Sequence, residues 1–530
     1  KIFFQTTHSK TLSESGDSDS TESPLIEDRW SHNITYRQLV ISACIGIFQL
    51  AWNPYLHDLR RLVPFLFIYN ICSIVIAYPI FYLELAIGVV TKKGLLNCWD
   101  MSPAARGVGF AMIGCCMFTA LAAGAFGSRC LALLVHSMHS FLPWLHCAAA
   151  ANPPCAARHR PLSPDAETPA QSFYFNFVLN LKRDGLEGGL GDIVWELTIY
   201  YCICWFLIYC IAIKRVYSYS KLVLFKDVLA YFVLICCGFG AIRLDGVRAV
   251  FTEYDWNTLF EGFQIWREAI EYSLLEMSVG QGSLVMLGSY LPKQSHKLGT
   301  TALLALGASK TSSMGATMVL AANFAALKAD YDNKATVPGA STMIMWSDYV
   351  ARIPGSQFWS ALVFFTLFLL SISTALLVQT MMSTCTGRTL RKSAWAFLIL
   401  TCLLFCFIGV ITLCTRGGQY ILDFLLKWPV TMPRVFIAAT LTGIVTYVYG
   451  QTTFCEDVYF SVGEYPSLFL RVCWALTPGL LIAVFGTGLG TCWSIEKSIA
   501  GCLLVAFIVM PILLFFAINV VFKCRVRVRL

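Results

Sequence analysis

An acidic residue inside an apolar segment is the first feature of this sequence that could do chemistry. Glu276 lies within "EYSLLEMSVGQGSLVML", residues 271–287, four residues before a Gly-Gln-Gly triplet. A carboxylate within a membrane-spanning helix is costly and usually functional. Glycines interrupt a helix, and a membrane tolerates the freed backbone groups where they line a cavity. Glu276 therefore indicates a site at a helix break inside a membrane.

The composition of the chain predicts that it is a membrane protein. Of the 530 residues, 57% are hydrophobic and only 13% are charged, whereas a soluble domain has about 25% charged residues. Segments of about 20 apolar residues, enough to span a bilayer as a helix, recur along the whole chain. We expect an all-α polytopic membrane protein of about twelve helices. The expected spans are residues 37–55, 62–89, 107–137, 193–213, 222–242, 264–290, 299–327, 357–385, 394–414, 430–450, 468–490 and 498–522.

The charge pattern predicts the orientation of these spans. Twelve spans put both termini on one side, and the Lys/Arg-rich connections fall on that side, so it is cytoplasmic by the positive-inside rule. The net charge of +8 then belongs to cytoplasmic loops and not to a nucleic-acid-binding surface. We expect a multi-pass protein of the plasma membrane with both termini in the cytoplasm.

Three parts of the chain are distinguished by composition. Residues 1–36 are rich in Ser, Thr and acids and predict a disordered cytoplasmic tail, residues 37–522 form the transmembrane domain, and residues 523–530 form a basic cytoplasmic tail. The connection 138–192 is extracellular. Its Cys147 and Cys155 could form a disulfide on that oxidising side; the alternative is two free thiols.

Two spans carry helix breakers at matching positions of a possible five-helix repeat. The first contains "GIFQLAWNPY", in which Gly46 and Pro54 flank Gln49, and the sixth contains the Gly-Gln-Gly triplet. Broken helices at matching positions of two halves indicate the midplane binding site of a secondary transporter. The motifs of serine hydrolases, zinc proteases and phosphate loops are not found in the sequence, so we do not expect an enzyme.

Five separate motifs resemble those of the neurotransmitter:sodium symporters, solute carrier family 6. They are "AYPIFYLELAIG" (77–88), "LPWLHC" (142–147), "GDIVWELTIYYCICWFLIY" (191–209), "SVGQGSLVMLGSY" (278–290) and "VYGQTTFCEDV" (448–458). The resemblance extends from Trp30 to about residue 520. It implies two inverted five-helix repeats, with helices 1 and 6 broken, plus two further helices. Members of that family carry amino acids, monoamines or osmolytes, driven by sodium and often chloride.

The substrate contacts that the resemblance implies are altered. Phe48 replaces a glycine whose amide approaches the substrate carboxylate, and Ala123 replaces a tyrosine that binds it. Gly46 stands where monoamine carriers place an aspartate, so an amino-acid-like substrate is favoured over a monoamine. The implied pocket consists of Gly46, Phe48, Gln49, Ala123, Leu275, Ser278 and Gln281.

The second sodium site of the family keeps suitable oxygens. The resemblance implies carbonyl ligands at Ser42, Ile45 and Leu370 and side-chain ligands at Ser373 and Thr374. Hard cations prefer several such oxygens. The alternative is that both hydroxyls bond to the preceding helical turn. We expect no organic cofactor and at most one sodium ion.

The same resemblance implies that this chain has lost the first sodium site and the chloride site of the family. Only Ser313 keeps the chemistry of the chloride ligands, and an ionised Glu276 would repel chloride. Lys310 follows Ser309, which takes the place of a sodium-binding asparagine. The residues at this former site are Cys44, Gln49, Phe65, Tyr272, Glu276, Ser309, Lys310 and Ser313.

Three interpretations of Glu276 and Lys310 are open. The two form an ion pair that replaces bound sodium and chloride, because buried charges need a partner. Alternatively, Lys310 faces elsewhere and Glu276 contacts water in the cavity. In the third interpretation, Glu276 titrates and links transport to protons, since burial raises the pKa of a carboxyl group.

The resemblance also implies two gates. The inner gate is made of Glu27, Trp30, Tyr290 and Arg388. Glu27 and Arg388 reverse the charges of the arginine and aspartate that bridge in relatives, so a salt bridge of opposite polarity is one interpretation and two unrelated surface charges the other. Trp52 replaces the outer-gate arginine.

These observations predict a secondary active transporter of a small organic solute that works by alternating access, with ion coupling altered from sodium and chloride. The alternative is a transporter-like membrane protein that does not transport and acts as a scaffold, regulator or receptor. The expected partners are a small-molecule substrate and the lipid bilayer, and no nucleic acid.

Overall fold

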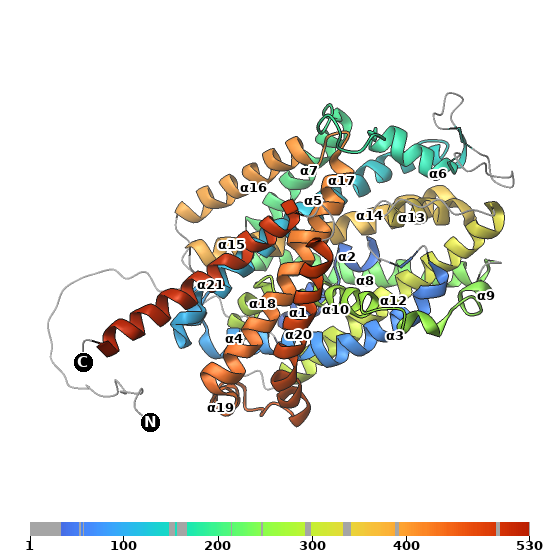
Figure 1. Ribbon diagram of the computed structural model, residues 1–530. Coiled ribbons are helices and arrows are strands. Elements are labelled where there is room, and N and C mark those ends of the chain that lie inside the picture. Colours follow the sequence, from blue (N-terminus) through green and yellow to red (C-terminus); the bar gives the residue numbers. More distant parts are fainter. Residues whose placement is uncertain are drawn as a thin grey trace.

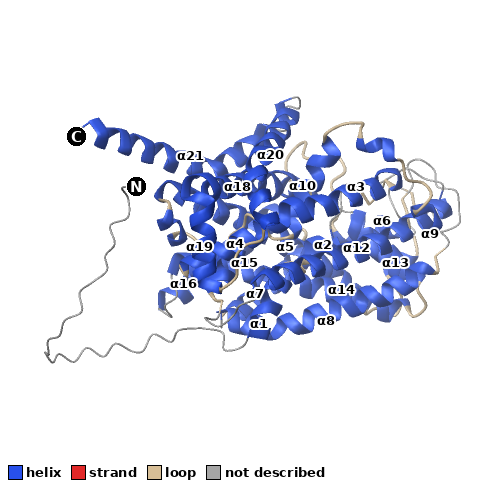
Figure 2. Cartoon of the chain, turned by 90° about the horizontal axis from the view of Figure 1, so that it is seen from below, coloured by secondary structure: helices blue, strands red, loops and turns tan. Residues whose placement is uncertain are grey.

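The computed structural model describes residues 33–51, 55–56, 58–147, 154–155, 167–213, 215–244, 247–291, 298–331, 341–386, 392–493 and 499–528. Helices make up most of this part of the chain, as Figure 2 shows. Its only β-structure is a pair of isolated bridges, Cys155–Glu167 and Ile193–Thr415. The predicted all-α membrane fold is confirmed.

The helices follow the expected order of spans (Figure 1). The first five spans are α1 (Asn33–Ala43) with α2 (Ile47–Ala51), α3 (Leu59–Cys72) with α4 (Tyr78–Thr91), α5 (Arg106–Ser137), α7 (Trp195–Ala212) and α8 (Arg215–Ile242). The next five are α10 (Gln264–Glu276) with α11 (Ser283–Ser289), α12 (Leu298–Tyr331), α14 (Ser356–Ser371) with α15 (Thr374–Thr386), α16 (Lys392–Thr412), and α17 (Gly418–Leu425) with α18 (Met432–Gly443) and α19 (Gln451–Val462). The last two are α20 (Leu468–Trp493) and α21 (Ile499–Val528), and α6 (Pro169–Ser172), α9 (Val247–Val250) and α13 (Ser341–Arg352) are short connecting helices.

Nine helices in the described part of the chain are long and apolar enough to cross a membrane. The other three of the twelve expected spans are the two broken helices and α12, which lie where they were predicted. The pieces of the broken spans are too short to cross a membrane singly. These three spans hold Glu276, Lys310 and most of the predicted site.

One span is longer than the sequence predicted. Helical structure is continuous over Gly418–Val462, whereas hydropathy indicated only residues 430–450. Asp423, Lys427 and Pro429 in its first half lower the apolar character of that stretch. Residues 426–431 adopt a π-helical turn around Pro429, which lets the helix continue past the proline.

Both predicted helix breaks are present. The first break separates Ala43 from Ile47, and the second separates Glu276 from Ser283. In the second break Gly280 and Gly282 have φ angles of 79° and 77°, a left-handed conformation that glycine adopts without steric cost. Ser278 has a φ of 55°, which is uncommon for a residue with a side chain.

The environment of the outer helices fits a lipid bilayer. Large apolar side chains on α8, α16 and α21 are exposed, among them Phe232, Phe239, Phe407 and Phe507. On a soluble monomer such a surface would be an aggregation liability, whereas lipid tails cover it in a membrane. In the connection 138–192, Cys147 and Cys155 form the expected disulfide, with their Cα atoms 5.6 Å apart.

Candidate functional site

A small cavity of about 50 Å³ lies at the two helix breaks. All seven residues expected to contact substrate line it: Gly46, Phe48, Gln49, Ala123, Leu275, Ser278 and Gln281. Pockets that hold small molecules usually measure about 300–1,000 Å³. The cavity is therefore in a contracted state, with room for water but not for an amino acid.

Side-chain hydrogen bonds link the two broken helices beside the cavity. The Gln49 amide donates to the carbonyl of Cys44 at 2.9 Å and to that of Glu276 at 2.8 Å, while its oxygen accepts from the Gly46 amide at 2.8 Å. The Ser278 hydroxyl donates to the Ala43 carbonyl at 2.6 Å. Freed backbone groups of one break are thus satisfied by side chains of the other, which links the two broken helices.

An aromatic contact lies beside the cavity. Phe48 packs edge-to-face against Phe126 of α5, with ring centroids 6.0 Å apart. Ala123 lies one helical turn away from Phe126 on the same helix and lines the cavity. Phe48 and Ala123 thus both border the cavity, one with a large side chain and the other with a small one.

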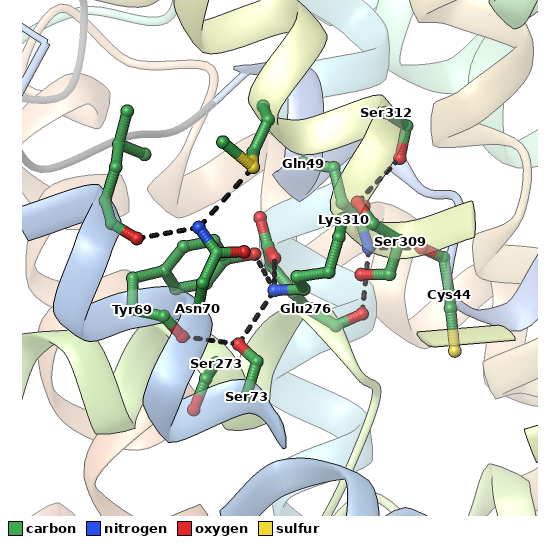
Figure 3. Close-up of polar contacts among 12 residues, drawn as sticks. Cys44, Gln49, Tyr69, Asn70, Ser73, Ser273, Glu276, Ser309, Lys310 and Ser312 are labelled. Atoms are coloured by element: carbon green, nitrogen blue, oxygen red, sulfur yellow. Dashed lines mark hydrogen bonds and ion pairs between the residues drawn. The ribbon is translucent and has the colours of Figure 1, made fainter. Parts of the chain in front are cut away.

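Glu276 and Lys310 form a buried ion pair between α10 and α12. The Lys310 Nζ lies 3.0 Å from Glu276 Oε2, and the Glu276 side chain is fully buried. The same ammonium donates to the hydroxyls of Tyr69 and, at 2.8 Å, of Ser73 on the second span (Figure 3). A lysine has three N–H donors, and all three have partners here. The ion pair of the first interpretation is present, and its replacement of bound sodium and chloride stays a prediction.

The other residues of the former ion site surround this pair. Phe65 and Tyr272 have ring centroids 6.1 Å apart, and Tyr272 packs on Tyr69 at 5.1 Å. Ser313 lies beside Glu276 and Tyr272. Ser309, fully buried, precedes Lys310 in α12, and the Cys44 carbonyl accepts the bond from Gln49.

A second buried ion pair lies at the first helix break. The fully buried Lys226 of α8 places its Nζ 2.8 Å from Asp227 Oδ1, 2.7 Å from the Ile45 carbonyl and 3.5 Å from that of Ser42. The Ser42 hydroxyl donates to the same Asp227 oxygen at 3.2 Å. Our sequence analysis missed this pair, although "FKD" inside the apolar span 222–242 is a visible signal.

The five residues expected at the second sodium site are divided between two environments. Ser42 and Ile45 contact Lys226, whereas Leu370, Ser373 and Thr374 line the cavity. The Thr374 hydroxyl donates to the Ser371 carbonyl at 2.5 Å, as in the alternative of a bond to the preceding turn. Within the described residues the Ser373 hydroxyl has no hydrogen-bond partner.

Two further buried charges hold the second break and were not predicted. Arg434 of α18 donates to the Val279 carbonyl at 2.7 Å, to Thr119 Oγ1 at 2.7 Å and to Gln281 Oε1 at 2.9 Å. Glu84 of α4 accepts from the Gly280 amide at 2.7 Å. Both side chains are fully buried, and an arginine in an apolar span was the signal that could have revealed the first.

The gates are described only in part. Tyr290 follows the end of α11, partly buried. Glu27, Trp30, Trp52 and Arg388 lie outside the described residues, so the reversed salt bridge stays a prediction.

Comparison with known proteins points to one family. The family model described as the sodium:neurotransmitter symporter family matches residues 27–518. The sodium-dependent nutrient amino acid transporter 1 of Drosophila grimshawi is 26% identical over 503 residues, which cover 88% of this chain and 78% of that protein. The protein of the same name from Drosophila virilis is 27% identical over 494 residues, covering 86% and 76%. That of Drosophila melanogaster is 26% identical over 507 residues, covering 88% and 78%.

Proposed function

We propose that this chain, which belongs to the sodium:neurotransmitter symporter family, is a secondary active transporter of an amino-acid-like solute at the plasma membrane, with both termini in the cytoplasm. The observation that carries the proposal is the convergence of all seven expected substrate contacts on one cavity between two broken helices. Relatives named as nutrient amino acid transporters support the substrate class.

The charges around the cavity favour a solute with a carboxylate. Gly46, which lines the cavity, offers no carboxylate to a monoamine. The Arg434 guanidinium lies directly behind the cavity residues Thr119 and Gln281, to which it donates hydrogen bonds. Its positive charge acts over a short distance in a medium of low dielectric constant. An acidic group at this end of the cavity is therefore favoured over a second cation.

Alternating access requires the contracted cavity to open. Gly280 and Gly282 in the second break have positive φ angles, and a few residues at the ends of helices can absorb the backbone changes of such a motion. The hydrogen bonds from Gln49 and Ser278 across the two breaks would exchange for bonds to the solute. The contracted state is one end of the proposed cycle.

The Glu276–Lys310 pair supplies the charges that relatives take from ions at this position. A sodium and a chloride ion together are neutral, and so are one ammonium and one carboxylate 3.0 Å apart. The Lys310 ammonium already binds the hydroxyls of Tyr69 and Ser73, and the carboxylate would repel chloride. The residues here do not fit either ion, which supports altered ion coupling.

Uptake by cells that express the full chain tests this function. We expect accumulation of at least one labelled amino acid from a panel, and none of a labelled monoamine. Ala123→Phe should abolish the uptake, because the new ring fills a cavity of about 50 Å³. Leu303→Phe, at an exposed position of α12, is the matched control and should transport normally. Uptake of no amino acid despite normal surface expression would contradict the proposal.

A second candidate function is a membrane protein that does not transport and acts as a scaffold, regulator or receptor. The observation that favours it is the small volume of the cavity, beside which Gln49 and Ser278 cross-link the two broken helices. Normal surface expression without uptake of any solute in the same experiment is the result expected from this candidate.

A further inference from the structure

The Lys226–Asp227 pair has no part in the substrate cavity, yet it lies at the break of the first helix. We propose that the Lys226 ammonium is a built-in cation, which takes the position that a bound sodium ion would take at the Ser42 and Ile45 carbonyls. Its meaning for transport rests on the proposed function. The site itself is a property of the fold and can be tested without transport.

The end of α1 is a place where a cation is expected. The helix ends at Ala43, and the carbonyls near a helix C-terminus carry a partial negative charge. In transporters with discontinuous helices, unwound carbonyls and half-helix C-termini bind the coupling cation. Here the Ile45 carbonyl accepts from Lys226 at 2.7 Å, and the Ser42 carbonyl lies 3.5 Å away.

The ammonium saturates this group of oxygens. Its three N–H donors match three acceptors: the two carbonyls and Asp227 Oδ1 at 2.8 Å. A sodium ion on the same carbonyls would overlap the Lys226 nitrogen and bring a second positive charge into contact with the first. The residues at the first break therefore do not fit a sodium ion as they stand.

Asp227 makes this a built arrangement and not a chance contact. Its Oδ1 accepts from Lys226 and, at 3.2 Å, from the Ser42 hydroxyl. The pair is thus fixed to the end of α1 by both a side chain and the backbone. If the lysine were removed, the carbonyls of Ser42 and Ile45 and the carboxylate of Asp227 would remain as a set of oxygens of the kind that hard cations prefer.

The second helix break also carries a lysine paired with an acid. α10 ends at Glu276, where the Lys310 ammonium binds the carboxylate. Gln49 links the two breaks, because its amide donates to the carbonyls of both Cys44 and Glu276. The α1, α8 and α12 helices also pack against one another. Each break thus carries its own lysine and acid, and the two pairs together are neutral.

Sodium-dependent stability of the full-length protein, purified in detergent, tests the proposal. The unfolding temperature is measured in sodium chloride and in N-methyl-D-glucamine chloride of equal ionic strength. We expect no difference for the unaltered protein. Lys226→Ala should unfold at a lower temperature in N-methyl-D-glucamine and show a saturable rise with sodium. Adding Asp227→Asn to that variant should remove the rise.

Lys328→Ala is the matched control, because Lys328 forms an exposed ion pair with Glu253 and its loss should create no response to sodium. A saturable response of the unaltered protein overturns the proposal, and this arm decides if Lys226→Ala does not fold. A folded Lys226→Ala variant that responds no more than Lys328→Ala also overturns it. If the unfolding temperatures respond to sodium as expected but the protein takes up no solute, the proposed transport is contradicted. The proposal of a built-in cation is then still supported.

Discussion

At the scale of residues, the site is built on two buried ion pairs, Lys226–Asp227 and Glu276–Lys310. An unpaired ion inside a protein costs several kcal/mol, and its partner must repay that cost through good geometry. Lys226 and Lys310 each have three acceptors within hydrogen-bond reach. Such saturation fixes both side chains in place, which is the requirement for standing in for an ion.

A double-mutant cycle on Glu276 and Lys310 tests the first pair. Glu276→Gln and Lys310→Met should each destabilise the protein by about 3–5 kcal/mol, because each leaves an uncompensated buried charge. The double variant should be less destabilised than the sum of the two, since no charge remains. Thermal unfolding measures the stability of the unaltered protein, of the two single variants and of the double variant.

The exposed pair Lys328–Glu253, whose charged atoms lie 2.8 Å apart, is the control for this cycle. Exposed pairs contribute about 0–1 kcal/mol. Removing the charge of either Lys328 or Glu253 should therefore destabilise the protein only slightly. If the Glu276 and Lys310 variants are each harmful and the double variant is no better than their sum, the pair is not the source of the stability.

The sequence allowed prediction of only part of this residue-scale chemistry. Glu276 and the cavity residues could be found because they occupy positions that the resemblance implies for substrate or ion contacts. Lys310 could be found because it follows Ser309, which occupies such a position. Lys226 lies on a helix for which the resemblance implies no substrate or ion ligand. Its contact with Ile45 joins residues 181 positions apart. The hydropathy of one span carries no information on such contacts across the bundle.

At the scale of elements, the second broken helix is held by close packing as well as by charge. α11 packs against α4 at Gly88 and Gly288. A Cβ atom on Gly288 would lie 2.2 Å from the Leu85 carbonyl oxygen, and one on Gly88 would lie 2.1 Å from that of Val285. Small residues at such contacts let helix backbones approach closely in membranes.

Gly288→Ala should therefore destabilise the protein by about 1–3 kcal/mol, the usual cost of overpacking. The carbonyl that it would strike belongs to a helix backbone and cannot move aside cheaply. Gly307→Ala in α12 meets no atom within 4 Å and is the control. It should be neutral or slightly stabilising, since alanine is the better helix former. Equal unfolding temperatures for the two variants would contradict the account of this contact.

Element boundaries were predictable where hydropathy alone determines them. The ends of α5, α7 and α20 lie within a few residues of the expected spans. The span beginning at Gly418 was underestimated because Asp423 and Lys427 interrupt its apolar character. The helix breaks were predicted from Gly46 with Pro54 and from the Gly-Gln-Gly triplet, but the side chains of Arg434 and Glu84 that stabilise the second break come from other helices.

At the scale of the whole molecule, an apolar exterior encloses a polar centre that carries its own counter-charges. Phenylalanines on α8 and α21 face outward, while the ion pairs of Lys226 and Lys310 lie at the two helix breaks. In the proposed transporter these pairs stand in for bound ions, so sodium would supply no driving force at these positions. We therefore expect transport of its solute not to depend on sodium.

Counterflow in proteoliposomes containing the purified full-length protein tests the central claim most directly. Vesicles loaded with an unlabelled amino acid that the protein accepts are diluted into the same amino acid, labelled, with either sodium or N-methyl-D-glucamine on both sides. The account predicts equal rates of label entry in the two solutions. Entry that requires sodium, and stops when sodium is replaced, would contradict it.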